Sequence, residues 1–347
     1  MTRPKLKAQW FNGNDYTPFT TLFSLHKIDD STYESAHPAF GPGNSTRAFG
    51  GHVYAQSALA ASKSVPEGFV LHSITGHFLQ LGFTNVPFTY TISPIRDGAG
   101  YVQRRVDVSQ KRTKGLMFTA VCSFKRPEKS QATRTLDGRL EERYALLKGR
   151  GPESWAEAPS IDSPFWWEAA KEFGEDKFPG LDMRKVDMDA YNKDRMTLER
   201  RQLMFYRVLG DMPDAKEGPN LHAIAHLYAS DRNGLFPIAN FLGKGDEYSA
   251  IASLSFTVVL HAEAEELGLI DADGKAKWFC VELAIDHIGH GRGLMVERLW
   301  DVQSGKPVAS TMQDGLLRLK PGIKQGLVGE NTIFADNDKR LAKSEKL

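Results

Sequence analysis

One order of secondary-structure signals occurs twice in this chain, and this repeat constrains the fold more than any other feature. In each half, a segment with small apolar residues at helical spacing is followed by four strand-like runs. The two halves share little sequence identity, so the repeat is one of element order. It predicts two similar units, each built from one helix and one sheet.

In the first half, the helical segment opens at Gly50-Gly51 and stops before Pro66 and Gly68. Its small apolar face predicts close packing against a broad surface such as a sheet. The strand-like runs lie near residues 71–81, 86–95, 101–110 and 115–125. Asp97-Gly98 and Lys114-Gly115 supply short turns, and short turns join antiparallel neighbours.

The second half repeats this order. Its helix is expected to start at Pro219, with Asn220 as N-cap, and to end by Gly234 and Pro237. Four more strand-like runs cover residues 250–260, 278–287, 293–302 and 307–319. Ser304-Gly305 makes the last turn.

These signals predict an α+β fold in which each antiparallel sheet wraps around its helix. A chain of 347 residues is too long for one ordinary core, which also favours two units. We expect an N-terminal unit over 1–126, a connecting segment over 127–205 that crosses the surface with some helix, a C-terminal unit over 206–325, and a polar tail over 326–347.

Charge and composition narrow the partners and the compartment. The net charge of +1 argues against a broad nucleic-acid or membrane surface, and no apolar run approaches the length of a membrane span. Cys122 and Cys280 lie in apolar runs and are expected to be reduced, which favours an intracellular location. The last residues, Glu345-Lys346-Leu347, partly match a peroxisomal Ser-Lys-Leu signal, so both the cytoplasm and the peroxisomal matrix stay open.

Several catalytic motifs are absent. There is no G-x-S-x-G elbow and no P-loop, and the GHGRG stretch at 289–293 lacks the spacing of a dinucleotide fingerprint. His222 and His226 are four residues apart on the expected helix, but no third ligand is evident, so no metal is predicted. A phosphate-binding role for one or two scattered cations stays open. These cations are Lys63, Arg104, Arg105, Arg292 and Arg298.

Three polar residues stand in apolar surroundings in the second half. Asp231 lies late on the expected helix, and Ser253 and Gln313 lie on the first and last strands. Each residue alone fits a structural role. Together, a carboxylate, a hydroxyl and an amide can hold one water where the helix meets the sheet. Burial near a helix C-terminus should raise the pKa of Asp231 toward that of a general base.

Several stretches resemble the acyl-CoA thioesterase II family of double-hotdog enzymes. They are FGGHVYAQSALAAS, LHSITGHFL, RDGAGYVQRRV, YASD and VASTMQDGLLR. The resemblance covers about 20–126 and 220–320 and implies a double hotdog that hydrolyses acyl-CoA to free acid and CoA. It also implies catalytic roles for Asp231, Ser253 and Gln313. The chain departs from the family after Ser253, where only His261 is kept and residues 262–277 form a longer insertion.

The expected reaction needs no cofactor and no metal, because CoA is part of the substrate. Backbone N–H groups at the start of the first helix, from Gly50, Gly51 and His52, are the candidates for holding the oxyanion. The acyl group is expected to be fatty or polyketide-like. Two alternatives stay open: a hotdog enoyl-CoA hydratase or dehydratase that uses His222 and His226, and a non-catalytic acyl-CoA binding protein. By analogy with other hotdog proteins, a homodimer is expected.

Overall fold

The computed structural model describes residues 17–111, 113–136, 138–173 and 178–321. Within these ranges, no helix is both long and apolar enough to cross a membrane. The predicted polar tail over 326–347, with its terminal Glu345-Lys346-Leu347, lies outside the described residues. Its interpretation as a peroxisomal address therefore stays a prediction.

The first half contains the predicted central helix and its four strands, with additional short elements before them. The short elements are α1 (Phe19–Leu22), β1 (Leu25–Lys27), β2 (Thr32–Ser35) and the 3-10 turn η2 (Pro42–Asn44). The helix is α2 (Gly50–Ser62), and the strands are β3 (Val70–Phe78), β4 (Thr89–Asp97), β5 (Tyr101–Ser109) and β6 (Phe118–Lys125).

The second half has the same order after its own leading strand. The leading strand is β9 (Gln202–Val208), and the helices are α6 (Pro219–Ser230) and the short α7 (Phe236–Phe241). The four strands that follow are β10 (Tyr248–Leu260), β11 (Phe279–Gly289), β12 (Arg292–Asp301) and β13 (Pro307–Leu319).

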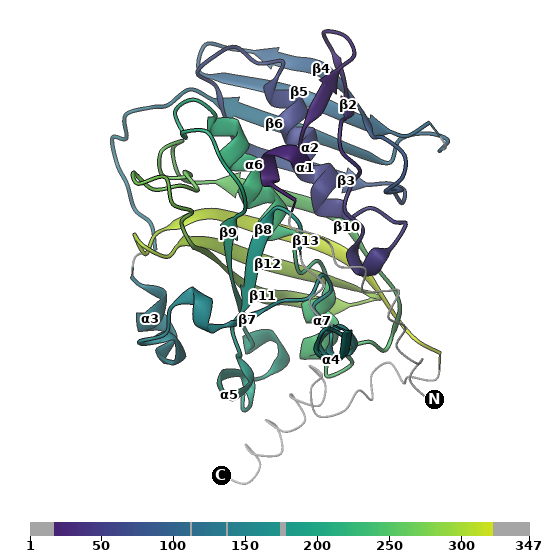
Figure 1. The fold of residues 1–347 in the computed structure, drawn as a ribbon, viewed down its shortest axis with the longest axis vertical. Helices are drawn as coiled ribbons and strands as arrows, with labels where there is room; N and C mark the ends of the chain where they lie inside the picture. Colours follow the sequence, from purple (N-terminus) through teal and green to yellow (C-terminus); the bar gives the residue numbers. More distant parts are fainter. Residues whose placement is uncertain (1–16, 112, 137, 174–177, 322–347) are drawn as a thin grey trace.

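All thirteen strands of the described residues form one antiparallel sheet, in the order β1-β2-β4-β5-β6-β3-β10-β13-β12-β11-β9-β8-β7. The first unit contributes β2-β4-β5-β6-β3 and the second contributes β9-β11-β12-β13-β10, which is the same order reversed. The two units join edge to edge where β3 pairs with β10, with Thr75 opposite Thr257. The upper and lower halves of Figure 1 show the two units. The predicted α+β architecture is confirmed.

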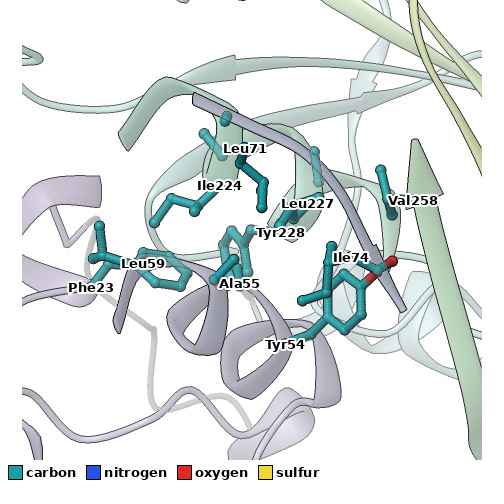
Figure 2. Close-up of a cluster of buried hydrophobic side chains, with 14 of the residues drawn as sticks. Phe23, Tyr54, Ala55, Leu59, Leu71, Ile74, Ile224, Leu227, Tyr228 and Val258 are labelled. Atoms are coloured by element: carbon teal, nitrogen blue, oxygen red, sulfur yellow. The ribbon is translucent and has the colours of Figure 1, made fainter. Parts of the chain in front are cut away.

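The two central helices pack against each other inside the curved sheet. Figure 2 shows Ala55 and Leu59 of α2 facing Ile224 and Leu227 of α6. Ile74 of β3 and Val258 of β10 close the same cluster, and all six side chains are buried. Alanines along both helices allow the helices to approach closely, so the N-terminus of α2 comes near the C-terminus of α6.

The segment 127–205 differs from the expected surface connection with some helix. It adds β7 (Ala156–Glu157), β8 (Leu181–Lys185) and the start of β9 to the second unit's sheet. It also carries short helical elements. They are α3 (Leu140–Arg143), η3 (Ala145–Leu147), η4 (Pro152–Ser154), α4 (Pro164–Phe173), α5 (Asp189–Asn192) and η5 (Thr197–Glu199). The domain division itself stays a prediction.

The expected cap at Asn220 is wrong. Gly218 is the N-cap of α6, with Pro219 in the first turn. The Asn220 side chain instead joins the helix to the first unit: its Oδ1 accepts from Leu71 N–H at 2.8 Å and its Nδ2 donates to Phe69 O at 3.0 Å. A tertiary contact has replaced the local one.

Candidate active site

Asp231 lies where α6 ends and touches the beginning of α2. It is the C-cap of α6, and its carbonyl accepts from Gly234 N–H at 2.8 Å, in a turn that Gly234 closes with a φ of +48°. Its side chain is 2% exposed. The backbone N–H of Gly51 donates to its carboxylate. A Cβ atom at Gly51 would lie 2.8 Å from the Asp231 Cβ, so glycine is needed for this approach.

Gln313 joins Asp231 to Ser253. It faces inward from β13 and is 1% exposed. Its Nε2 donates to Asp231 Oδ1 at 2.5 Å and to Ser253 Oγ at 2.8 Å. The structure therefore brings together the three residues that the sequence singled out, from one helix end and two neighbouring strands.

A bulge in β10 sets the position of Ser253. Ser253 lies opposite Gly315 of β13, whereas Ser255 lies opposite Asp314, so Leu254 is an extra residue in β10. Bulges of this kind redirect side chains next to functional sites. Gly315 leaves room for the chain after Asp231, because a Cβ atom there would lie 1.8 Å from Leu235 Cδ1. Asp231, Ser253 and Gln313 are called the trio below. Ser253 is half-buried and has the most contact with solvent of the three.

The environment of Asp231 shifts its titration toward neutral pH. Burial raises the pKa of Asp231 to about 7, and this shift is opposed by the hydrogen bonds from Gln313 and from the Gly51 N–H. Removal from water destabilises the ionised form of a carboxylate. A carboxylate with this pKa can accept a proton from water at neutral pH and return it afterwards.

The three candidates for holding an oxyanion differ in their surroundings. The Gly51 N–H is used by the Asp231 carboxylate, and the His52 N–H donates to Phe49 O at 3.2 Å. The His52 ring is fully buried and stacks on Phe23, and burial lowers its pKa to about 3. The backbone N–H of Gly50 therefore remains as the candidate of the three.

His222 and His226 have structural partners. The Nδ1 of His222 accepts from Leu269 N–H at 3.0 Å, and its Nε2 lies 2.8 Å from Pro213 O. His226 lies between the Tyr206 hydroxyl at 2.7 Å and Leu267 O at 2.9 Å. Neither ring has a contact with Asp231. The histidine pair on which the hydratase alternative depends is thus occupied in joining α6 to its neighbours.

None of the five scattered cations has a contact with the trio. Arg104 binds Asp97, Arg105 binds Asp107 and Arg292 binds Asp314. A groove of about 2010 Å³ lies over α4, α5 and α7, but Asp231, Ser253 and Gln313 do not line it. The groove is therefore not where the three residues could meet a substrate carbonyl. Among the described residues, no group of three or more His, Cys, Asp or Glu could hold a metal ion.

The sequence analysis did not identify Glu297 and Thr311 as candidate site residues. Both are buried beside the trio, and Thr311 Oγ1 donates to Glu297 Oε2 at 3.0 Å. A signal was present, because Met295, Glu297 and Leu299 alternate on the inward face of β12 and Glu297 is the charged one. A carboxylate on the buried face of a strand is costly unless it has a partner, so its presence indicates a specific role.

At the corresponding positions of the described strands and helix, the first unit has no equivalent of this site. Its sheet has a matching bulge between Leu71 and Ser73, and counting from the Thr75–Thr257 pair places Leu71 where the second unit has Ser253. The same registers place Cys122 at the position of Gln313. Lys63, the C-cap of α2, corresponds to Asp231. The repeat therefore conserves the fold and not the polar side chains.

The comparisons with known proteins agree with this architecture. Residues 39–125 match the acyl-CoA thioesterase N-terminal domain, and residues 154–317 match the acyl-CoA thioesterase C-terminal domain. The chain is 23% identical over 327 residues to acyl-coenzyme A thioesterase 8 of Mus musculus, covering 88% of this chain and 90% of the relative. It is 26% identical over 307 residues to acyl-CoA thioesterase 2 of Haemophilus influenzae, covering 86% and 96%.

Solved structures share the fold. An acyl-CoA thioesterase II from Mycobacterium marinum superposes with a TM-score of 0.62 at 21% identity, over 88% of this chain and 99% of that one. A protein with a hot dog fold from Alicyclobacillus acidocaldarius gives a TM-score of 0.58 at 15% identity, over 86% and 97%. The expected double hotdog is therefore confirmed.

Proposed function

Because the chain belongs to the acyl-CoA thioesterase family and is a thioester hydrolase, we propose that Asp231, Ser253 and Gln313 activate one water molecule to hydrolyse an acyl-CoA. The observation that carries the proposal is the contact of Gln313 Nε2 with both Asp231 Oδ1 and Ser253 Oγ, at 2.5 and 2.8 Å. A base, an alcohol and an amide thus meet within the reach of one water.

The reaction proceeds by attack of water on the thioester. The Asp231 carboxylate takes one proton as the water oxygen bonds to the carbonyl carbon. The resulting oxyanion lies at the N-terminus of α2, where the Gly50 N–H and the helix dipole favour negative charge. The carbon–sulfur bond then breaks, and the proton on Asp231 passes to the CoA sulfur. The products are the free acid and CoA.

We propose that Ser253 holds the water directly, and that Gln313 positions it by fixing Asp231 and Ser253 around it, without competing for its proton. The Gln313 amide donates hydrogen bonds and does not titrate, and the Ser253 hydroxyl both donates and accepts. The half-buried Ser253 gives the trio its side toward solvent, so the thioester approaches from that side. No cofactor or metal takes part.

The acyl group is fatty or polyketide-like in this proposal. The strand after Ser253, with Leu254 in its bulge, departs from the pattern of the resembled family. We expect the acyl chain to contact this region. A panel of acyl-CoAs from short to long, with branched and aromatic members, tests the preference. If the enzyme hydrolyses none of these acyl-CoAs, this class of substrate is excluded.

The experiment that tests the reaction follows thiol release from acyl-CoA by the purified protein. Asp231→Asn should lower kcat by about 10²–10⁴-fold or more, since it removes the general base. Asn keeps the size of the side chain, so KM should change little. Wild-type turnover by Asp231→Asn would refute the assignment. Loss of enoyl-CoA absorbance without thiol release would favour the hydratase alternative, and tight binding without turnover would favour the non-catalytic binding protein.

A further inference from the structure

Glu297 is a second buried carboxyl group beside Asp231, and the reaction described above does not use it. It lies on β12 opposite Thr311 of β13, and Gln313 is two residues further along β13 on the same inward face. Glu297 and Gln313 are 4% and 1% exposed. Diagonal neighbours of this kind are within reach of each other when the side chains are long.

In the corner of the site formed by Glu297 and Gln313, two buried oxygens have no hydrogen-bond partner among the described residues. One is Glu297 Oε1 and the other is Gln313 Oε1. The remaining polar atoms of both side chains are used, because Thr311 holds Glu297 Oε2 and Asp231 and Ser253 hold Gln313 Nε2. Buried polar atoms are nearly always paired, so these two oxygens, on diagonal neighbours of one sheet face, call for a hydrogen that one of the two side chains can supply.

The charges around Glu297 favour its neutral form. Burial raises the pKa of Glu297 well above its ordinary value, and the negative charge of Asp231 raises it further. Among the residues that the structure describes, Tyr206 of β9 also interacts electrostatically with Glu297, and burial raises the pKa of this tyrosine. Within the described part of the chain, no cation is among the groups that act on Glu297. A neutral carboxyl group carries the one hydrogen that the corner lacks.

We propose that Glu297 is a positioning residue, in which the carboxyl group held by Thr311 donates a hydrogen bond from Oε1 to Gln313 Oε1. This bond fixes which end of the amide faces Asp231. If the amide turned over, its oxygen would meet the Asp231 carboxylate and repel it. The inference rests on the proposed hydrolysis for its kinetic consequence and on the geometry of β12 and β13 for the bond itself.

Kinetics of the full-length chain test the consequence. Glu297→Leu should lower kcat by about 10–100-fold with little change in KM. Residues that orient a catalytic side chain commonly have effects of this size. Glu297→Gln should restore most of the lost kcat, because its amide can donate to Gln313 and accept from Thr311. Glu282→Gln is the matched control, since Glu282 is as buried but binds Arg143, Tyr144 and Trp300.

Two kinetic results would overturn the proposal. One is wild-type kcat in Glu297→Leu, and the other is a Glu297→Gln variant as slow as Glu297→Leu. If Glu297→Leu does not fold, Thr311→Val takes its place: a reduced kcat supports the proposal, and an unchanged kcat contradicts it.

A double-mutant cycle tests the bond without any turnover. Unfolding of the wild type, Glu297→Leu, Gln313→Leu and the double variant is compared in urea. The double variant should lose less stability than the two single variants together, because the bond can be broken only once. Additive losses would overturn the inference even if the enzyme hydrolyses acyl-CoA. Coupled losses without thiol release would instead refute the proposed function and leave the bond in place.

Discussion

Asp231 is expected to titrate within the working pH range, and the rate should follow it. Because burial raises its pKa to about 7 and the ionised form is the base, kcat/KM should rise with pH and level off above about 7. The measurement is a pH profile of thiol release at limiting acyl-CoA. Gln313→Leu should move the rising limb to higher pH, because the Gln313 hydrogen bond lowers the pKa of Asp231. A flat profile between pH 5 and 8 would contradict the role of Asp231.

The same burial should cost stability. The pKa of Asp231 is higher in the folded chain than in the unfolded one, so ionisation favours unfolding as pH rises from about 4 to about 7. Asp231→Asn removes this cost and should stabilise the fold by an amount on the order of 4 kcal/mol at pH 8. Urea unfolding at pH 4 and pH 8 is the comparison. Equal effects at the two pH values would show that ionisation of Asp231 is not the cause.

At the residue scale, the sequence predicted the meeting of Asp231, Ser253 and Gln313 but not how it is held. Their polarity among apolar neighbours was readable. Gly51 was expected to serve an oxyanion, whereas its N–H binds Asp231. This contact, like the Glu297–Thr311 pair, depends on which strands and helix ends become neighbours. That information lies in the strand registers, which a single sequence does not display.

At the scale of elements, the site depends on the N-terminus of α2 lying against the C-terminus of α6. Gly51→Ala should disturb this junction, because the new Cβ atom would lie 2.6 Å from the Phe49 ring and 2.8 Å from Asp231 Cβ. We expect a loss of about 1–3 kcal/mol in stability from overpacking, and a reduced kcat because Asp231 must shift. Urea unfolding and thiol release measure the two effects.

The control for Gly51→Ala is Gly100→Ala. A Cβ atom at Gly100 would meet nothing within 4 Å, so this variant carries the same change of residue without the clash. It should keep wild-type kcat. If both variants behave alike, the close approach of α2 to Asp231 does not matter for the reaction.

The strands that the sequence predicted best were those with clear alternation and clear turns. Residues 307–319 were predicted to form a strand, and β13 has those bounds. β9 was missed because its residues are buried on both faces, so the run does not alternate. β2 was missed because it has only four residues. The repeated part of each unit therefore has one strand more than the sequence suggested, and β1, β7 and β8 extend the sheet further.

At the scale of the whole molecule, one chain supplies all three residues of the candidate site. The pairing of β3 with β10 already joins two hotdog units, and both units contribute to the surroundings of Asp231. The expected homodimer stays a prediction that sedimentation or light scattering can test. Whatever the assembly state, turnover per chain should not depend on protein concentration. A specific activity that falls on dilution, in step with dissociation, would show that a second copy completes the site.

In the proposed reaction water, and not the Asp231 side chain, attacks the thioester. A single turnover in ¹⁸O-labelled water, with enzyme in excess over acyl-CoA, tests it most directly. Direct attack predicts that the free acid from this first turnover contains the label and that Asp231 stays unlabelled. An unlabelled acid together with ¹⁸O in the Asp231 carboxylate would mean that Asp231 forms a covalent acyl intermediate, and it would contradict the account.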